Sequence, residues 1–142
     1  MQTDIQERCD KIEAGYEYLL SYAAQGLLTD QGSPSGKQLR EQLARMIEAL
    51  SGLRESSASL LKKEQLVPAD RFQAFFDVLV EDANHALVAA DLVLAQPDIS
   101  SQLIDNLNAS MHVRALLADL FLITEILELR QTHLQADLNV HS

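Results

Sequence analysis

The sequence has no tryptophan, one cysteine, five glycines and three prolines, and aromatic residues make up 5% of its 142 positions. The lone Cys9 excludes an internal disulfide, and so few aromatic residues predict a core of Leu, Ile, Ala and Val. With 47% hydrophobic and 23% charged residues, the chain has the composition of an ordinary globular protein rather than of a disordered one. At this length we expect one domain, residues 1–142, built around one core.

Basic residues are also scarce. The chain has 11 Lys and Arg against 21 Asp and Glu, which gives a formal net charge of -10. The shortage is greatest in residues 72–142, where Arg114 and Arg130 stand against ten acidic residues. Clustered Lys and Arg provide the affinity for phosphate backbones and for anionic lipid, so this charge argues against nucleic-acid and membrane partners. It favours protein partners with basic surfaces.

Long uncharged apolar runs are missing as well. The most apolar stretch, residues 115–129, contains Asp119, Glu125 and Glu128, whereas a bilayer span needs about 20 mostly uncharged residues. The first 14 residues are rich in charge and do not resemble a signal peptide. We therefore expect a cytoplasmic protein that does not enter a membrane.

The three prolines, Pro34, Pro68 and Pro97, divide the chain into four blocks, because proline is disfavoured inside a helix. Within each block the apolar residues recur with a helical period, and no segment alternates with the period of two that a strand requires. We predict an all-α fold with helices at about 3–27, 36–63, 69–95 and 100–138. Short connections between them favour a four-helix up-and-down bundle.

The fourth block differs from the others. A single helix over 100–138 would be about 58 Å long at about 1.5 Å per residue, longer than the other three. It either breaks near residues 106–110, at the weak helix formers Asn106, Asn108 and Ser110, or extends beyond the bundle. Between residues 113 and 129 it is apolar nearly all round, which predicts contacts on more than one side.

Two pairs of polar residues are candidates for a site. Asp82 and His85 are three residues apart, the spacing of a metal-binding half-site in helical bundles. No second half-site is found, so we predict no bound metal. His112 and Asp119 lie seven apart on one side of the fourth helix, and an ionised carboxylate in an apolar run is costly to bury. Asp119 is part of a ligand- or proton-handling site with His112 or Arg114, a buried polar contact that fixes helix register, or simply part of an exposed polar strip.

Other residues are candidates for an interface. At a helical period of 3.6, Tyr18 and Tyr22 lie on the back of the first helix, opposite its core face. Val78, Val88 and Leu92 interrupt the polar back of the third helix. These five side chains either form a surface for self-association or, if the helix phase differs slightly, join the core.

No catalytic constellation in the sequence is complete, and Cys9 on an apolar helix face predicts an inert thiol. We therefore predict a non-enzymatic accessory protein: a protein-interaction module that acts as a homo-oligomer, most simply a homodimer, without a cofactor. An adaptor, an assembly factor or chaperone, and a regulatory subunit all fit this description. The alternative is a metal- or small-ligand-binding helical bundle that uses Asp82, His85, His112 and Asp119. An enzyme acting through Asp119 ranks last.

Overall fold

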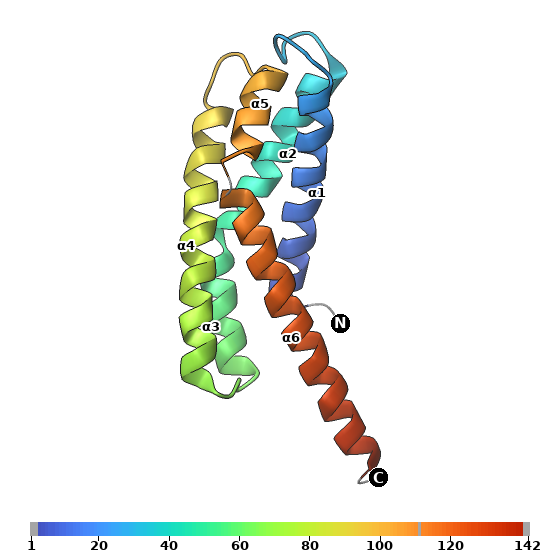
Figure 1. Cartoon of the computed structure of the whole chain (residues 1–142), viewed down its shortest axis with the longest axis vertical. Helices are drawn as coiled ribbons and strands as arrows, with labels where there is room; N and C mark the ends of the chain where they lie inside the picture. Colours follow the sequence, from blue (N-terminus) through green and yellow to red (C-terminus); the bar gives the residue numbers. More distant parts are fainter. Residues whose placement is uncertain (1–2, 111, 141–142) are drawn as a thin grey trace.

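The computed structural model describes residues 3–110 and 112–140, and all regular secondary structure in these ranges is α-helical (Figure 1). The all-α prediction is therefore confirmed for the described residues. The helices are α1 (Asp4–Ala24), α2 (Pro34–Ser51), α3 (Leu53–Lys63), α4 (Ala69–Leu94), α5 (Ser101–Asn108) and α6 (His112–Val140). Within the described ranges, no helix combines the length and hydropathy needed to cross a lipid bilayer.

Figure 1 shows how the chain passes through the molecule. α1 rises from the N-terminus, and α2 and α3 descend in succession. α4 then rises alongside α3 and α2, and α5 and α6 descend again. α1 packs against α2, α5 and α6, while α4 packs against α2, α3 and α6. One continuous apolar core, mainly of Leu, Ile and Ala side chains, joins all six helices.

The prolines mark boundaries as predicted. Pro34 begins α2, Pro68 directly precedes α4, and Pro97 lies between α4 and α5. Pro34 is tolerated because the first turn of a helix leaves its N–H groups without intrahelical partners. Pro68 is the N-cap of α4 and Pro97 lies in a loop, so neither interrupts a helix. Ser33 caps α2 by accepting a hydrogen bond from the Gly36 N–H at 3.0 Å.

The helix predicted at 36–63 is two helices, α2 and α3, separated at Gly52. Arg8 of α1 contacts the chain at this break: its Nη1 donates to the carbonyls of Glu48 and Ala49 at 3.1 and 3.2 Å. These carbonyls lie in the last turn of α2, where a cation is favourable. A Cβ at position 52 would overlap the Arg8 guanidinium, so glycine provides the space for this contact. Glycine at position 52 weakens the helix locally, and the contact with Arg8 comes from another helix.

The buried face of α1 follows a repeat of 3.5 residues. Ile5, Ile12 and Leu19 are seven residues apart and fully buried, as in helices that coil around one another. A straight-helix period of 3.6 places Leu20 in the core and Tyr22 on the back. The structure reverses the two: Tyr22 is buried and Leu20 is exposed.

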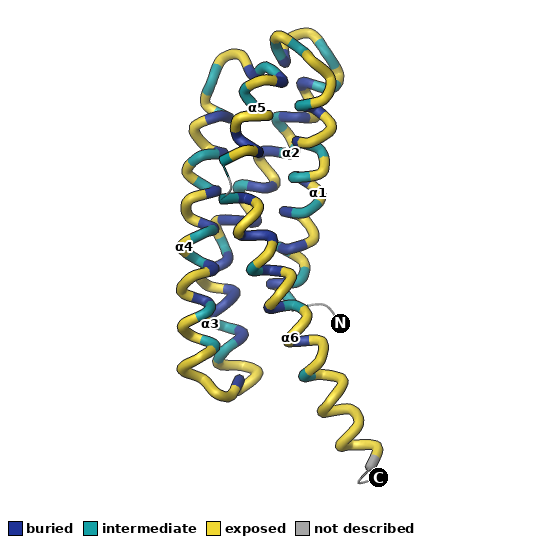
Figure 2. The backbone as a smooth tube through the Cα atoms, in the orientation of Figure 1, coloured by how far each residue is buried: buried dark blue, intermediate teal, exposed yellow. Residues whose placement is uncertain are grey.

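The predicted helix at 100–138 is also broken, since α5 ends at Asn108 and α6 begins at His112. The break falls at the predicted stretch, residues 106–110; the next residue, Met111, lies outside the described residues. α6 nevertheless extends beyond the other helices as well. Its buried positions end at Leu127, and every residue from Gln131 to Asn139 is exposed (Figure 2).

Candidate functional site

The candidate site lies where α4 and α6 pack against each other. Asp82 and His85 are on adjacent turns of α4, and His112 and Asp119 are two turns apart on α6. Because the two helices run in opposite directions (Figure 1), Asp82 meets Asp119, and His85 meets His112. The imidazole rings of the two histidines are stacked, with centroids 4.6 Å apart and planes 26° from parallel.

The environment of Asp119 disfavours its charged form. Burial raises the pKa of its carboxyl, and hydrogen bonding and charge repulsion from the Asp82 carboxyl raise it further, to about 7. The Oδ2 atom of Asp119 is buried and has no hydrogen-bond partner among the described residues. Asp119 is therefore set to hold a proton near neutral pH, in contrast with an ordinary surface aspartate.

The four predicted residues thus form two separate pairs rather than one convergent set. His85 is exposed, and His112, Asp82 and Asp119 are partly buried. Among the residues that the structure describes, no group of three or more His, Cys, Asp or Glu side chains is placed to hold a metal ion.

The tyrosines proposed as interface residues lie elsewhere. Tyr22 is fully buried, and its hydroxyl donates to the Ile99 carbonyl at 2.7 Å. Tyr18 is half-buried, and its hydroxyl donates to the Ser35 carbonyl at 2.7 Å. Tyr22 thus joins the core and offers no surface to a partner, because a 3.5-residue repeat places it on the buried side of α1.

The interface candidates on α4 are exposed. Val78, Val88 and Leu92 retain 50%, 61% and 64% of their accessible surface. On α6, Phe121, Leu122, Ile126 and Leu129 are exposed as well. Residues 113–129, which are apolar nearly all round, therefore have both a buried side and an exposed side, and the sequence pattern alone does not separate the two.

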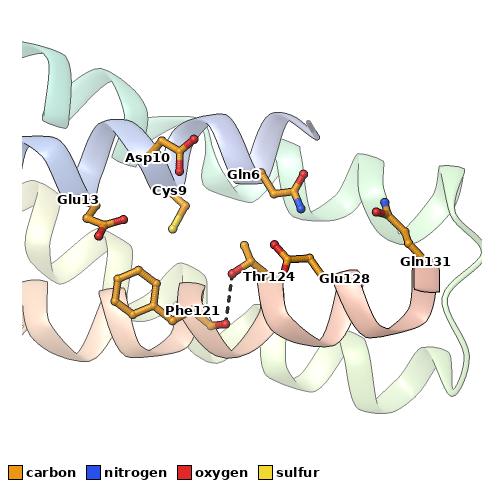
Figure 3. A pocket seen from close by; sticks show the side chains of 8 residues that line it. All are labelled: Gln6, Cys9, Asp10, Glu13, Phe121, Thr124, Glu128 and Gln131. Carbon is orange, nitrogen blue, oxygen red and sulfur yellow. Dashed lines mark hydrogen bonds between the residues drawn. The ribbon is translucent and has the colours of Figure 1, made fainter. Parts of the chain in front are cut away.

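An open groove of about 430 Å³ lies between α1 and α6, and its composition was not anticipated (Figure 3). Figure 3 shows Cys9 pointing from α1 toward α6, while the Thr124 hydroxyl donates to the Phe121 carbonyl. Burial, followed by the charges of Asp10 and Glu13, raises the pKa of the Cys9 thiol to about 11. The thiol is therefore protonated at neutral pH and a poor nucleophile, as its place on an apolar face predicted. The groove is lined by Gln6, Cys9, Asp10, Glu13, Phe121, Thr124, Glu128 and Gln131.

A second polar cluster, which sequence analysis missed, joins the loops at 25–33 and 95–100. Asp30 is buried; its carboxylate accepts from Arg40 Nε at 2.5 Å and from the Ile99 N–H at 2.7 Å. These contacts outweigh burial and hold the pKa of Asp30 below its usual value. Arg40 also donates to the carbonyls of Leu94 and Gln96 at the end of α4. The cluster is structural, since every one of these contacts is internal.

The chain has no significant match to a protein-family model, to a curated protein sequence or to a solved structure. Its function is therefore inferred from the residues and geometry described above.

Proposed function

We propose that this protein is a non-enzymatic, cytoplasmic protein-interaction module that acts as a homo-oligomer, most simply a homodimer, in the role of an adaptor, assembly factor or regulatory subunit. The observation that carries the proposal is the exposed apolar face of α6. Leu122, Ile126 and Leu129 follow the spacing i, i+4, i+7 and are 51%, 37% and 60% exposed.

This face is opposite the one that α6 buries. Leu120, Ile123 and Leu127 pack into the core, and at 100° per residue the exposed trio lies on the other side of the helix. A helix with apolar side chains on both sides has a second contact to make. Val78, on the adjacent α4, is exposed too.

The proposed architecture is a four-column up-and-down bundle. In this interpretation α1 and α4 are two columns, and the broken pairs α2–α3 and α5–α6 are the others. Support comes from the alternating directions in Figure 1 and from the packing of α1 and α4 against the remaining helices. Such a bundle presents α6 as an outer column whose far side is available to a partner.

A second copy of the chain is the simplest occupant of that face, because a two-fold axis would place the apolar trio of one α6 against that of the other. The strongly acidic charge of residues 72–142 favours additional protein partners with basic surfaces. The same charge disfavours nucleic acid and anionic membrane.

Light scattering at micromolar concentration tests the proposal. We expect a mass of twice 15.8 kDa for the natural chain and a single-chain mass for Leu122→Glu/Leu129→Glu. The matched control, Leu28→Glu/Val67→Glu, makes the same charge change at two exposed loop residues and should keep the doubled mass. A single-chain mass for the natural protein would contradict the proposal.

The alternative, a metal- or small-ligand-binding bundle, remains a prediction. In its favour, the structure brings Asp82 to Asp119 and His85 to His112 across two helices. Elemental analysis of untagged protein, with melting temperatures in added Zn²⁺, Ni²⁺, Mn²⁺ and Fe²⁺, tests it, because a ligand that binds the folded state raises its stability. A metal-free preparation with an unchanged melting temperature would contradict the metal-binding form.

A further inference from the structure

The side of α4 that faces solvent carries a regular stripe of exposed residues (Figure 2). On the opposite side, the buried residues recur at alternating spacings of three and four, from Phe76 to Val93. Such a 3.5-residue repeat keeps both sides of a helix in line, and it is the spacing of a coiled-coil seam. The exposed stripe has the same alternation and consists of Ala74, Val78, Glu81, His85, Val88 and Leu92.

The stripe is symmetric about the level of Ala83. Its six members form three pairs that lie equally far on either side of this residue, Glu81 with His85, Val78 with Val88, and Ala74 with Leu92. A two-fold axis at this level would lay the α4 of a second copy antiparallel on the first, so that each residue meets the other member of its pair. The small alanine would then meet the large leucine, and valine would meet valine.

Glu81 and His85 select the antiparallel orientation. In a parallel pair Glu81 would face Glu81 of the second copy, and the two carboxylates would repel. In the antiparallel pair the Glu81 carboxylate faces an imidazole, whose N–H can donate to it. The His85 ring stacks on His112 at 4.6 Å, and the residue stays exposed. A slide by one heptad would put Glu81 opposite Val78 or Leu92, so the polar pair also fixes the register.

We propose that this stripe of α4 is a self-association surface, on which the α4 of a second copy packs antiparallel about a two-fold axis at the level of Ala83. In Figure 1, α4 lies along one edge of the molecule, and the projecting end of α6 leaves the molecule on the other side. A second copy can therefore approach along the length of α4. The surface does not include the exposed apolar face of α6, so the inference does not depend on the proposed α6 contact.

The α4 contact is expected to be weak. One helix on one helix gives a small interface, whereas specific stable interfaces bury about 1,200–2,000 Å². Asp77 and Asp91 are exposed beside the stripe, on either side of the level of Ala83. Asp77 would thus face Asp91 of the second copy, and these like charges repel. We expect the contact to be absent at about 1 µM and to form as the concentration approaches about 1 mM, the range of weak association.

Cysteine trapping tests the register in Leu122→Glu/Leu129→Glu, a background in which the α6 face is charged. Adding Val78→Cys/Val88→Cys puts thiols at facing positions, and mild oxidation of a concentrated sample should give a disulfide-linked dimer on non-reducing electrophoresis. Either cysteine alone should give about tenfold less, because equivalent positions of the two copies lie ten residues, or about 15 Å, apart along the helices. A disulfide requires Cα atoms within about 7 Å of each other.

Gln38→Cys/Glu48→Cys is the matched control, because these exposed residues have the same ten-residue spacing on α2. Cys9 is present in every variant, so its contribution is common to all of them. A dimer yield no higher than that of the control would overturn the α4 contact. Equal yields from the single and the double variants would exclude the antiparallel register. Neither result bears on the α6 contact, which the mass of the natural chain measures separately.

Sedimentation equilibrium in the same α6 background measures the effect of the facing acids. Asp77→Asn/Asp91→Asn should tighten association by about threefold or more at low salt, since two like-charged pairs are removed. Glu41→Gln/Glu55→Gln takes the same charge from exposed positions of α2 and α3 and should tighten it less. Equal tightening by the two variants would show that net charge alone is responsible, and would contradict the placement of α4 against α4.

Discussion

Asp30 is buried and Asp119 is partly buried, yet their surroundings shift their pKa values in opposite directions. Asp30 lies against a guanidinium and a backbone N–H, and its pKa is lowered. Asp119 lies against another carboxyl, with one oxygen unpartnered, and its pKa is raised to about 7. Burial acts on both groups alike, so the partner decides the outcome. The ionised Asp30 carboxylate therefore stabilises the contacts between the two loops, whereas the α4–α6 contact is most favourable when Asp119 is protonated.

The largest expected effect comes from breaking the Asp30 ion pair. Arg40→Ala leaves the Asp30 carboxylate buried without its cation and the α4 carbonyls without a donor, so we expect a loss of about 3 kcal/mol in the free energy of unfolding. Urea melts at pH 7 measure it, with Arg45→Ala, an exposed arginine of the same helix, as the control. A loss below about 1 kcal/mol would place the pair among ordinary surface ion pairs.

An opposite effect of intermediate size is expected at Asp119. Asp119→Leu removes a carboxylate that is costly to bury when charged, and we expect stabilisation by about 1–2 kcal/mol at pH 8. The gain should shrink at pH 5, because the native carboxyl is then protonated in the folded state. Urea melts at both pH values check this. Destabilisation at pH 8 would show that the Asp82–Asp119 contact is a satisfied network.

The smallest expected effect sharpens the reassignment of Tyr22. Tyr22→Phe removes one hydrogen bond to the Ile99 carbonyl and keeps the buried ring, so stability should fall by about 1 kcal/mol. The mass in light scattering should equal that of the natural chain, because Tyr22 lies inside the core. A change in mass with unchanged stability would return Tyr22 to the list of interface residues.

The helices were largely predictable, since their boundaries depend on local signals. Pro34, Pro68 and Pro97 lie at or between helix ends as expected, and the break before α6 falls among the weak helix formers at 106–110. The separation at Gly52 was missed, although glycine is a weak helix former, because the contact that the Arg8 guanidinium makes there from α1 is tertiary. Local sequence specifies where a helix is weak, and tertiary contacts decide whether it breaks there.

The candidate site was predictable residue by residue but not as pairs. Asp119 is recognisable in the sequence as an acid in an apolar run. Asp82 and His85 are recognisable by their spacing of three residues. Which residue each of them contacts depends on how α4 and α6 align, and the sequence does not give that alignment. Asp30 and Arg40 gave no signal, because charged residues in and after a loop are ordinarily solvated. Tyr22 was misplaced because, by the end of α1, the difference between periods of 3.5 and 3.6 had accumulated.

The projecting end of α6 has a thermodynamic consequence of its own. Starting a helix is the costly step, and the packed part of α6 has already supplied that start for residues 131–139. These residues extend an existing helix at little cost per residue, although all of them are exposed. A protein that docks along Leu134 and Leu138 would therefore meet a preformed recognition helix and avoid most of the entropy loss of ordering a flexible tail.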